Sequence, residues 1–199
     1  MKKVLVILMG IMLMLGVSSC KCTKDVEPVV EFAEATIAAD RAQMDELVDT
    51  YKWFETRVEY DNAFDADTTL AVAKVESLFQ VAVEDSLGVK TFVYDFIHYP
   101  DVEDTDPNVI EGFVFDDQPL NDEEIVLTFS EALERLNEAN LPKPNSTKVV
   151  LRKALGPKPG VNAQYIFGNA DGELVFVDAV TGDVTDVDPA YVVEPEVEE

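Results

Sequence analysis

Apolar residues recur at steps of three and four in three stretches of this 199-residue chain: 29–50, 67–87 and 129–140. This spacing places the apolar side chains on one side of a helix, so we expect three amphipathic helices. Thr128 or Ser130 caps the third helix in this interpretation, and Glu131 completes a capping box with Thr128. The segment 50–61 suits helix or strand, and we interpret it as helix.

Shorter apolar runs rich in Val, Ile, Phe and Tyr predict strands at 90–99, 109–116, 147–155, 163–169 and 173–179. Asp171-Gly172 supplies a tight turn between the last two. Because the strands come in local runs, we expect an α+β fold, with helices packed on one face of an antiparallel sheet. The similar order of elements in 67–116 and 129–179 leaves open a diverged tandem duplication.

The first residues have the pattern of a secretory signal. Lys2 and Lys3 precede a 14-residue apolar run that ends in small residues, and this run is shorter than the roughly 20 residues of a spanning helix. Val17-Ser18-Ser19-Cys20 resembles a bacterial lipobox, which implies lipidation of Cys20. An ordinary cleaved signal that leaves Cys20 as a thiol is the alternative. We therefore expect a signal peptide at 1–19 and a lipid-anchored leader at 20–27.

Composition and charge narrow the partners. The chain is 47% hydrophobic and 28% charged, which is typical of a globular protein. Its 40 acidic and 15 basic residues give a net charge of −25, which repels nucleic acid and anionic head groups. We expect no nucleic-acid partner, and contact with the membrane through the lipid alone. Lys21 stands where an Asp favours inner-membrane retention, so we expect the outer membrane, with the domain facing the periplasm.

The C-terminal part carries a family resemblance. The helix that begins Ser130-Glu131-Ala132-Leu133, a strand with Tyr165, and the phrase "VDAVTGDV" at 177–184 follow in the order of a PepSY domain. Residues 127–184 are therefore similar to that family. We divide the mature chain into an N-terminal helical and two-stranded region at 28–120, a PepSY-like domain at 121–188 and an acidic tail at 189–199. Whether the N-terminal region is a second PepSY-like copy stays open.

The resemblance implies a helix-on-sheet module that binds a protein partner or inhibits a peptidase in the cell envelope. It supplies no catalytic residues and no cofactor, so we expect a non-enzymatic protein. Asp178, Thr181 and Gly182 have a structural role in this interpretation, because they form the turn that ends the last strand, with Gly182 at a positive backbone angle.

Other chemistry has weaker support in the sequence. His98 is the sole histidine, and we expect a packed or edge residue rather than a zinc ligand or triad member. The loop 101–108 offers oxygen ligands for a weak calcium site: Asp101, Glu103, Asp104 and Asp106. Calcium or small-ligand binding is one alternative function, and a hydrolase that works with paired carboxylates is another.

The register of the third helix predicts the core of the PepSY-like half. Ala132, Leu133 and Leu136 should pack on one face of the sheet. The strand residues expected on that face are Val149, Leu151, Tyr165, Phe167, Val175 and Val177.

Overall fold

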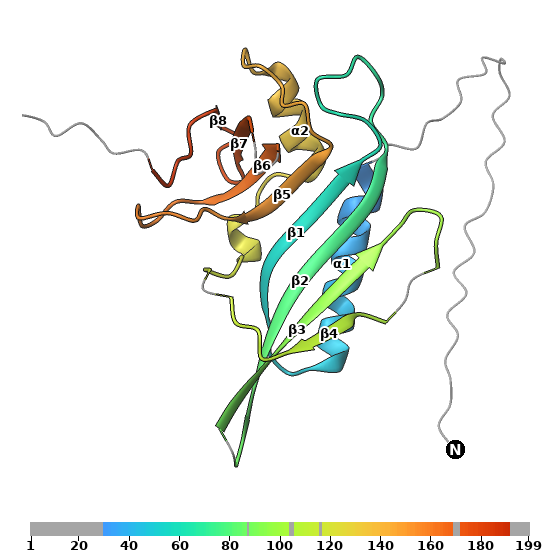
Figure 1. The fold of residues 1–199 in the computed structure, drawn as a ribbon, viewed down its shortest axis with the longest axis vertical. Helices are drawn as coiled ribbons and strands as arrows, with labels where there is room; N and C mark the ends of the chain where they lie inside the picture. Colours follow the sequence, from blue (N-terminus) through green and yellow to red (C-terminus); the bar gives the residue numbers. More distant parts are fainter. Residues whose placement is uncertain (1–29, 87, 104–105, 116, 169–171, 192–199) are drawn as a thin grey trace, which may run out of the picture.

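One eight-stranded antiparallel sheet dominates the structure (Figure 1). The computed structural model describes residues 30–86, 88–103, 106–115, 117–168 and 172–191. The first half contains α1 (Val30–Leu47), β1 (Lys52–Tyr60), β2 (Val72–Asp85), β3 (Gly88–His98) and β4 (Asn108–Glu111). The second half contains the short 3-10 helix η1 (Asp122–Glu124), α2 (Phe129–Glu138), β5 (Lys148–Lys153), β6 (Ala163–Gly168), β7 (Leu174–Asp178) and β8 (Val184–Thr185).

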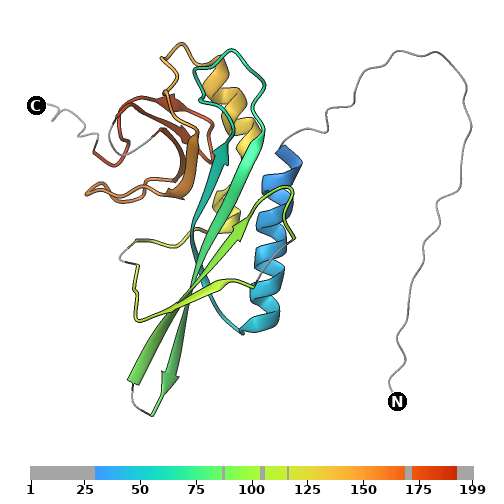
Figure 2. The same cartoon turned by 45° about the vertical axis from the view of Figure 1, so that its right-hand side comes forward.

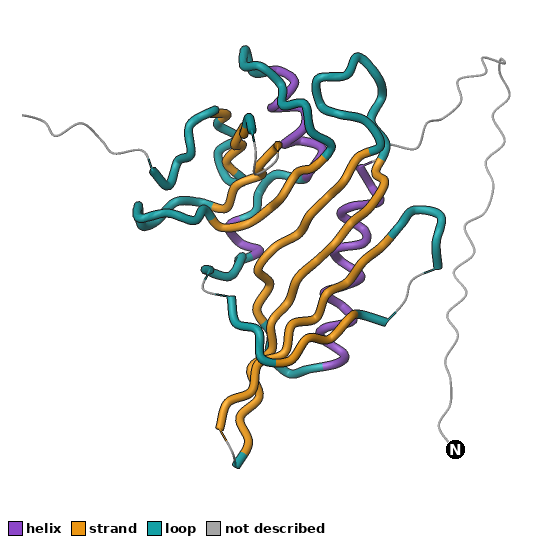
Figure 3. The backbone as a smooth tube through the Cα atoms, viewed as in Figure 1, coloured by secondary structure: helices purple, strands orange, loops and turns teal. Residues whose placement is uncertain are grey.

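The strands follow the order β4-β3-β2-β1-β5-β6-β7-β8 across the sheet. Each half is an α-helix followed in the chain by four strands, and the first strands of the two halves meet at the centre of the sheet. There, Thr56 of β1 lies opposite Leu151 of β5, and Val58 opposite Val149. Figure 2 shows β5–β8 turning away from the plane of β1–β4. Figure 3 shows the end of the β2–β3 hairpin projecting beyond the other strands.

The predicted α+β class is wrong. The described residues form a largely β fold, in which the two α-helices have 18 and 10 residues beside an eight-stranded sheet. The difference arises in two segments that we interpreted as helix. Residues 50–61 contain β1, and residues 67–87 contain the 14-residue strand β2.

Pairing explains why these segments are strands. In β1, Trp53, Thr56 and Val58 belong to residue types that favour a pleated, half-buried surface. In β2, Val75, Ser77, Phe79 and Val81 are all buried and recur at step two, the strand period, while Leu78 and Gln80 between them are buried on the opposite face. Together with Leu70, Val72 and Leu78, these residues also show steps of three and four. That spacing arises because the segment is largely apolar, and it does not indicate a helix. Val58 lies opposite Val75, and this register places both side chains in the core.

The other elements agree with the sequence pattern. Helix α1 lies within the predicted 29–50 segment, and four of the five predicted strand segments contain strands of similar extent. Strand β4 is shorter than predicted and ends at Glu111. Thr128 is the N-cap of α2, and its hydroxyl accepts a hydrogen bond from Glu131 N at 3.2 Å. Glu131 Oε2 in return accepts from Thr128 N at 2.8 Å, which completes the predicted capping box.

Both helices share one core with the sheet. Ala33 and Met44 of α1 and Phe129, Ala132 and Leu136 of α2 belong to the same cluster of buried residues. The predicted core face is confirmed, since the six strand residues expected on it are all buried in the same cluster as Ala132 and Leu136. Leu133 is partly buried at the edge of the cluster.

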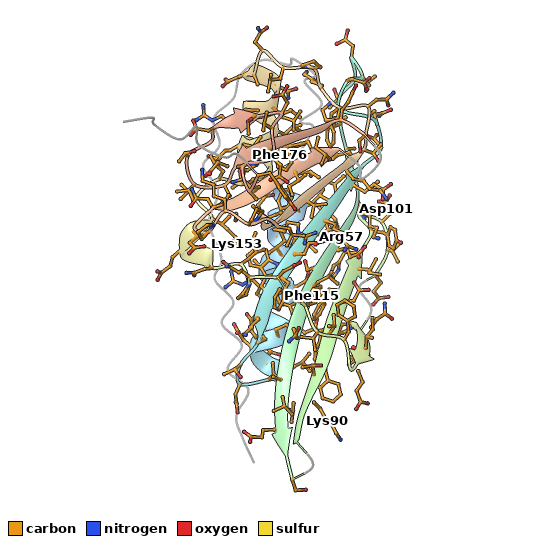
Figure 4. All side chains as sticks on the ribbon, turned by 60° about the vertical axis from the view of Figure 1, so that its left-hand side comes forward. Arg57, Lys90, Asp101, Phe115, Lys153 and Phe176 are labelled. Atoms are coloured by element: carbon orange, nitrogen blue, oxygen red, sulfur yellow. The ribbon has the colours of Figure 1, made fainter. Side chains whose placement is uncertain are left out.

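The opposite face of the sheet carries a charged network at its centre. Glu55 is buried there and pairs with Arg57 of its own strand, and with Arg152 of β5 at 3.4 Å. Arg152 also binds Asp117 at 2.6 Å. Phe115 stacks on Phe54 beside this network, with ring centroids 4.6 Å apart (Figure 4). The network links β1 to β5 and to the segment that follows β4.

Truncation of Leu136 tests this core. Leu136 is fully buried, so we expect Leu136→Ala to lower the free energy of unfolding by about 2–5 kcal/mol, because the missing methyl groups leave a cavity. Urea denaturation monitored by circular dichroism measures the change. Glu138→Ala on the exposed side of the same helix is the control, and we expect a change within about 0.5 kcal/mol. Equal losses in the two variants would contradict the register of α2.

Candidate functional site

A cleft opens to solvent between α1 and the segment that leads into α2. Its volume is about 250 Å³. We call it the α1 cleft, and twelve residues line it: Glu34, Ile37, Ala38 and Arg41 of α1; Trp53 of β1; Ile125, Val126, Leu127, Thr128 and Phe129; Leu151 of β5; and Tyr165 of β6. Most of these side chains are apolar. The cleft therefore lies at the junction of the two halves of the sheet.

The wall formed by residues 125–129 is fixed by hydrogen bonds to the second half. Val126 N and Leu127 N both donate to Ala179 O, at 2.9 and 3.0 Å. The hydroxyl of Tyr165 donates to Leu127 O. Because these bonds hold the backbone on both sides of Leu127, the wall is anchored to the second half of the fold, although it is not itself a strand.

Trp53 and Arg41 form the opposite wall. Trp53 is nearly buried, and its Nε1 donates to Thr56 Oγ1 at 3.0 Å. A register shift between Trp53 and Glu55 marks a bulge in β1 at this point, and such bulges re-aim side chains. The Arg41 guanidinium lies 5.7 Å from the Trp53 ring centroid, a cation–π distance. This pair presents a flat aromatic and cationic surface to the cleft.

Glu34 joins α1 to the N-terminus of α2. Its Oε1 accepts from Phe129 N at 2.8 Å, and a carboxylate there complements the helix dipole. Its Oε2 is buried and has no hydrogen-bond partner among the described residues. Burial raises the pKa of Glu34 above its ordinary value, although backbone hydrogen bonds from Phe129 and Ser130 act in the opposite direction. Tyr165 packs edge-on against Phe129, with centroids 4.8 Å apart.

This arrangement equips the cleft for apolar recognition. Most polar groups of its lining are already used, because Glu34 Oε1 caps α2, Thr128 forms the capping box, and Tyr165 holds Leu127 O. Glu34 Oε2 is left without a partner among the described residues. Arg41 lies against Trp53. The surface left for a ligand consists chiefly of aliphatic and aromatic groups, and Val126 is 64% exposed at the rim.

The turn residues Asp178, Thr181 and Gly182 lie next to this wall and hold it in place. Asp178 Oδ1 accepts from Val180 N at 2.8 Å and Thr181 N at 2.9 Å, and Gly182 has φ of 77°. Burial opposes ionisation of Asp178, but these bonds and those from Asn162 and Gln164 outweigh it and lower its pKa. The turn thereby fixes Ala179, whose carbonyl receives the two cleft-wall amides.

His98 lies at the end of β3, away from the cleft. It is buried, and its Nε2 is 2.6 Å from Oδ1 of Asp40, which is also buried. The ring lies parallel to Phe96 at a centroid distance of 6.4 Å. The predicted packed histidine is confirmed, and the pair ties α1 to β3.

The remaining predicted site residues do not come together. Asp101, Glu103 and Asp106 are exposed in the loop between β3 and β4, while Asp104 lies outside the described residues. Among the residues that the structure describes, no three His, Cys, Asp or Glu side chains are grouped to hold a metal ion. The predicted lipidation site, Cys20, also lies outside the described residues.

Sequence reasoning missed the residues of the cleft. Asp40 and Arg41 are charged residues within the predicted helix at 29–50, and nothing in the pattern indicates that Asp40 is buried and that Arg41 covers Trp53. Glu34 stands between apolar positions of α1, and its sequence neighbourhood does not indicate that it caps a helix 95 residues further along the chain. The one available signal was a tryptophan in a short aromatic segment, Trp53-Phe54.

Comparison with known proteins finds no matching family model, no matching curated protein and no matching solved structure.

Within the described part of the chain, neither helix has the length and apolar character needed to cross a membrane.

The raised pKa of Glu34 predicts a pH dependence. Folding raises this pKa, so the folded state loses stability relative to the unfolded state as pH rises through the Glu34 titration. Glu34→Gln removes the titration and keeps an oxygen acceptor for Phe129 N. We expect the free energy of unfolding of the wild type, minus that of the variant, to fall as pH rises above the ordinary pKa of a glutamate side chain. Urea denaturation at several pH values measures it, and a constant or rising difference contradicts the assignment.

Proposed function

We propose that this protein is a lipid-anchored, non-catalytic protein of the bacterial cell envelope that binds a protein partner through the α1 cleft. The observation that carries the proposal is the cleft itself, a solvent-open apolar cavity whose charged neighbours are already engaged within the fold. Such a surface recognises the apolar side chains of a partner by burying them, and it places few other requirements on that partner.

The size of the cleft favours a protein partner over a cofactor. Pockets for small molecules enclose roughly 300–1,000 Å³, and this cleft holds about 250 Å³. One large aromatic or aliphatic side chain is a suitable occupant. Binding surfaces commonly centre on one such anchor in an apolar pocket, surrounded by polar contacts. The Arg41 guanidinium, which lies over the buried Trp53 ring, offers a flat cationic surface on which an aromatic anchor can stack.

The resemblance of residues 127–184 to PepSY domains suggests the class of partner. Five cleft residues lie in that segment: Leu127, Thr128, Phe129, Leu151 and Tyr165. We therefore propose that the partner is an envelope protein such as a peptidase, which this protein binds or inhibits. The net charge of −25 favours a partner whose contact surface is basic around the apolar anchor.

A charge at the rim of the cleft tests this function. Val126 is 64% exposed, so Val126→Glu should leave the fold intact and place a carboxylate where the partner's apolar anchor binds. We expect the dissociation constant for the partner to rise at least about tenfold, because an unpaired charge is costly to bury. A photo-crosslinking side chain at 126 identifies the partner in envelope extract, and titration calorimetry with the purified partner measures the affinity.

Val187→Glu is the matched control, because Val187 is 54% exposed and does not line the cleft. We expect this variant to bind the partner as the wild type does. If the partner is a peptidase, Val126→Glu should lose inhibition in parallel with affinity. Equal affinities of the two variants would show that the partner does not use the cleft.

Lipidation at Cys20 is tested separately. Metabolic labelling of the full chain with a palmitate analogue should mark the wild type and not Cys20→Ala, because the lipobox cysteine carries the acyl chains. Cys22→Ala, two residues along, serves as the control and should be labelled like the wild type. If Cys20→Ala is still labelled, Cys20 is not the lipidation site. That result would not bear on the cleft, which the Val126→Glu experiment tests separately.

A further inference from the structure

Strand β4 forms one end of the sheet, and one of its edges is unpaired among the described residues. Gly112 N donates to Thr91 O of β3 at 2.9 Å, and Ile110 lies opposite Val93. Along an antiparallel strand, backbone groups point alternately to the two sides. Those of Ile110 and Gly112 point to β3, so those of Val109 and Glu111 point to the open edge. Unpaired N–H and C=O groups at an edge are a template for another strand.

The side chains at this edge do not protect it. Proteins commonly block an open edge with charged side chains such as Lys, with Pro or with a bulge, and β4 contains only one of these, the charged Glu111 at its end. All four of its residues are exposed, and Val109 and Ile110 are 53% and 50% exposed on opposite faces of the strand. Strand β8, at the other end of the sheet, has two residues and offers little template.

The charge around the edge is acidic except for Lys90 at one end. The described residues of 99–111 include four acidic side chains, no lysine and no arginine: Asp101, Glu103, Asp106 and Glu111. In Figure 4, Asp101 lies just beyond the end of β3, and Lys90 lies near its start, at the far end of the edge. A segment that pairs with β4 therefore meets apolar side chains on both faces and negative charge along its path.

From these three features we infer that the open edge of β4 binds an extended peptide segment of alternating basic and apolar residues by strand addition. Four residues of β4 span about 13 Å, so about four residues of the segment pair directly. A second copy of this chain is a poor occupant, because two surfaces of the same negative charge repel one another. This surface is distinct from the α1 cleft, and the inference does not depend on the proposed function.

A pair of synthetic peptides tests strand addition on the unmodified full chain. The first peptide is a labelled decamer of alternating Lys and Val, and the second has the same sequence with N-methyl groups on alternate residues. Both carry the same charge, but the second cannot donate hydrogen bonds from its methylated edge. By fluorescence anisotropy we expect the second to bind at least about tenfold more weakly, which corresponds to about 1.4 kcal/mol. Equal affinities would mean that charge alone attracts the peptide, which overturns the inference.

Substitution of Val109 locates the site. Its N–H points away from β3, so Val109→Pro removes a donor from the open edge without breaking the β3 pairing. Val109→Thr keeps the N–H and a similar shape. We expect the proline variant to bind the Lys-Val decamer about tenfold more weakly and the threonine variant to match the wild type. Equal binding by both variants overturns the inference. If circular dichroism shows that the proline variant is unfolded, the comparison of the two peptides alone tests the inference.

Discussion

The antiparallel pairing of β1 with β5 is the constraint on which the rest of the structure depends. Without it, each half would be a helix on a short sheet with an open central edge. With it, Val58 and Val149 lie opposite each other in one core, which includes buried residues of both helices. On the other face, the pairing buries the carboxylate of Glu55. Arg57 of β1 and Arg152 of β5 lie beside it, so the same two strands supply the cations that compensate its charge.

The α1 cleft is a consequence of that junction. Trp53 comes from β1, Leu151 from β5, and the wall at 125–129 belongs to the chain that passes from one half to the other. The wall is held from the far side by the turn at 178–183, because Ala179 receives the amides of Val126 and Leu127. The phrase "VDAVTGDV" thus has a structural role that reaches the cleft, although none of its residues lines the cavity.

Two carboxylates of α1, the buried Asp40 and the half-buried Glu34, connect this helix to its surroundings in different ways. Asp40 pairs with His98 of β3, and Glu34 caps the N-terminus of α2. A carboxylate loses its hydration on burial, so each must be compensated by a specific group, and that group fixes where the helix lies. Apolar contacts alone would permit α1 to slide along the sheet, whereas these two bonds set its position relative to β3 and to α2. The width of the cleft follows from that position.

Local pattern determined those parts of the protein in which periodicity and turn chemistry agree. The helix α2 with its Thr128 capping box, its buried face on β5–β7, and the turn at Gly182 could all be read from the sequence, because each depends on neighbours within a few residues or on a regular period. Residues 67–87 could not, since a largely apolar segment satisfies both the helix and the strand period. Only pairing with β1 and β3 made it the strand β2. The cleft was decided in the same way: Glu34, Arg41 and Trp53 acquire their partners from other elements, and such contacts leave no periodic trace in the chain.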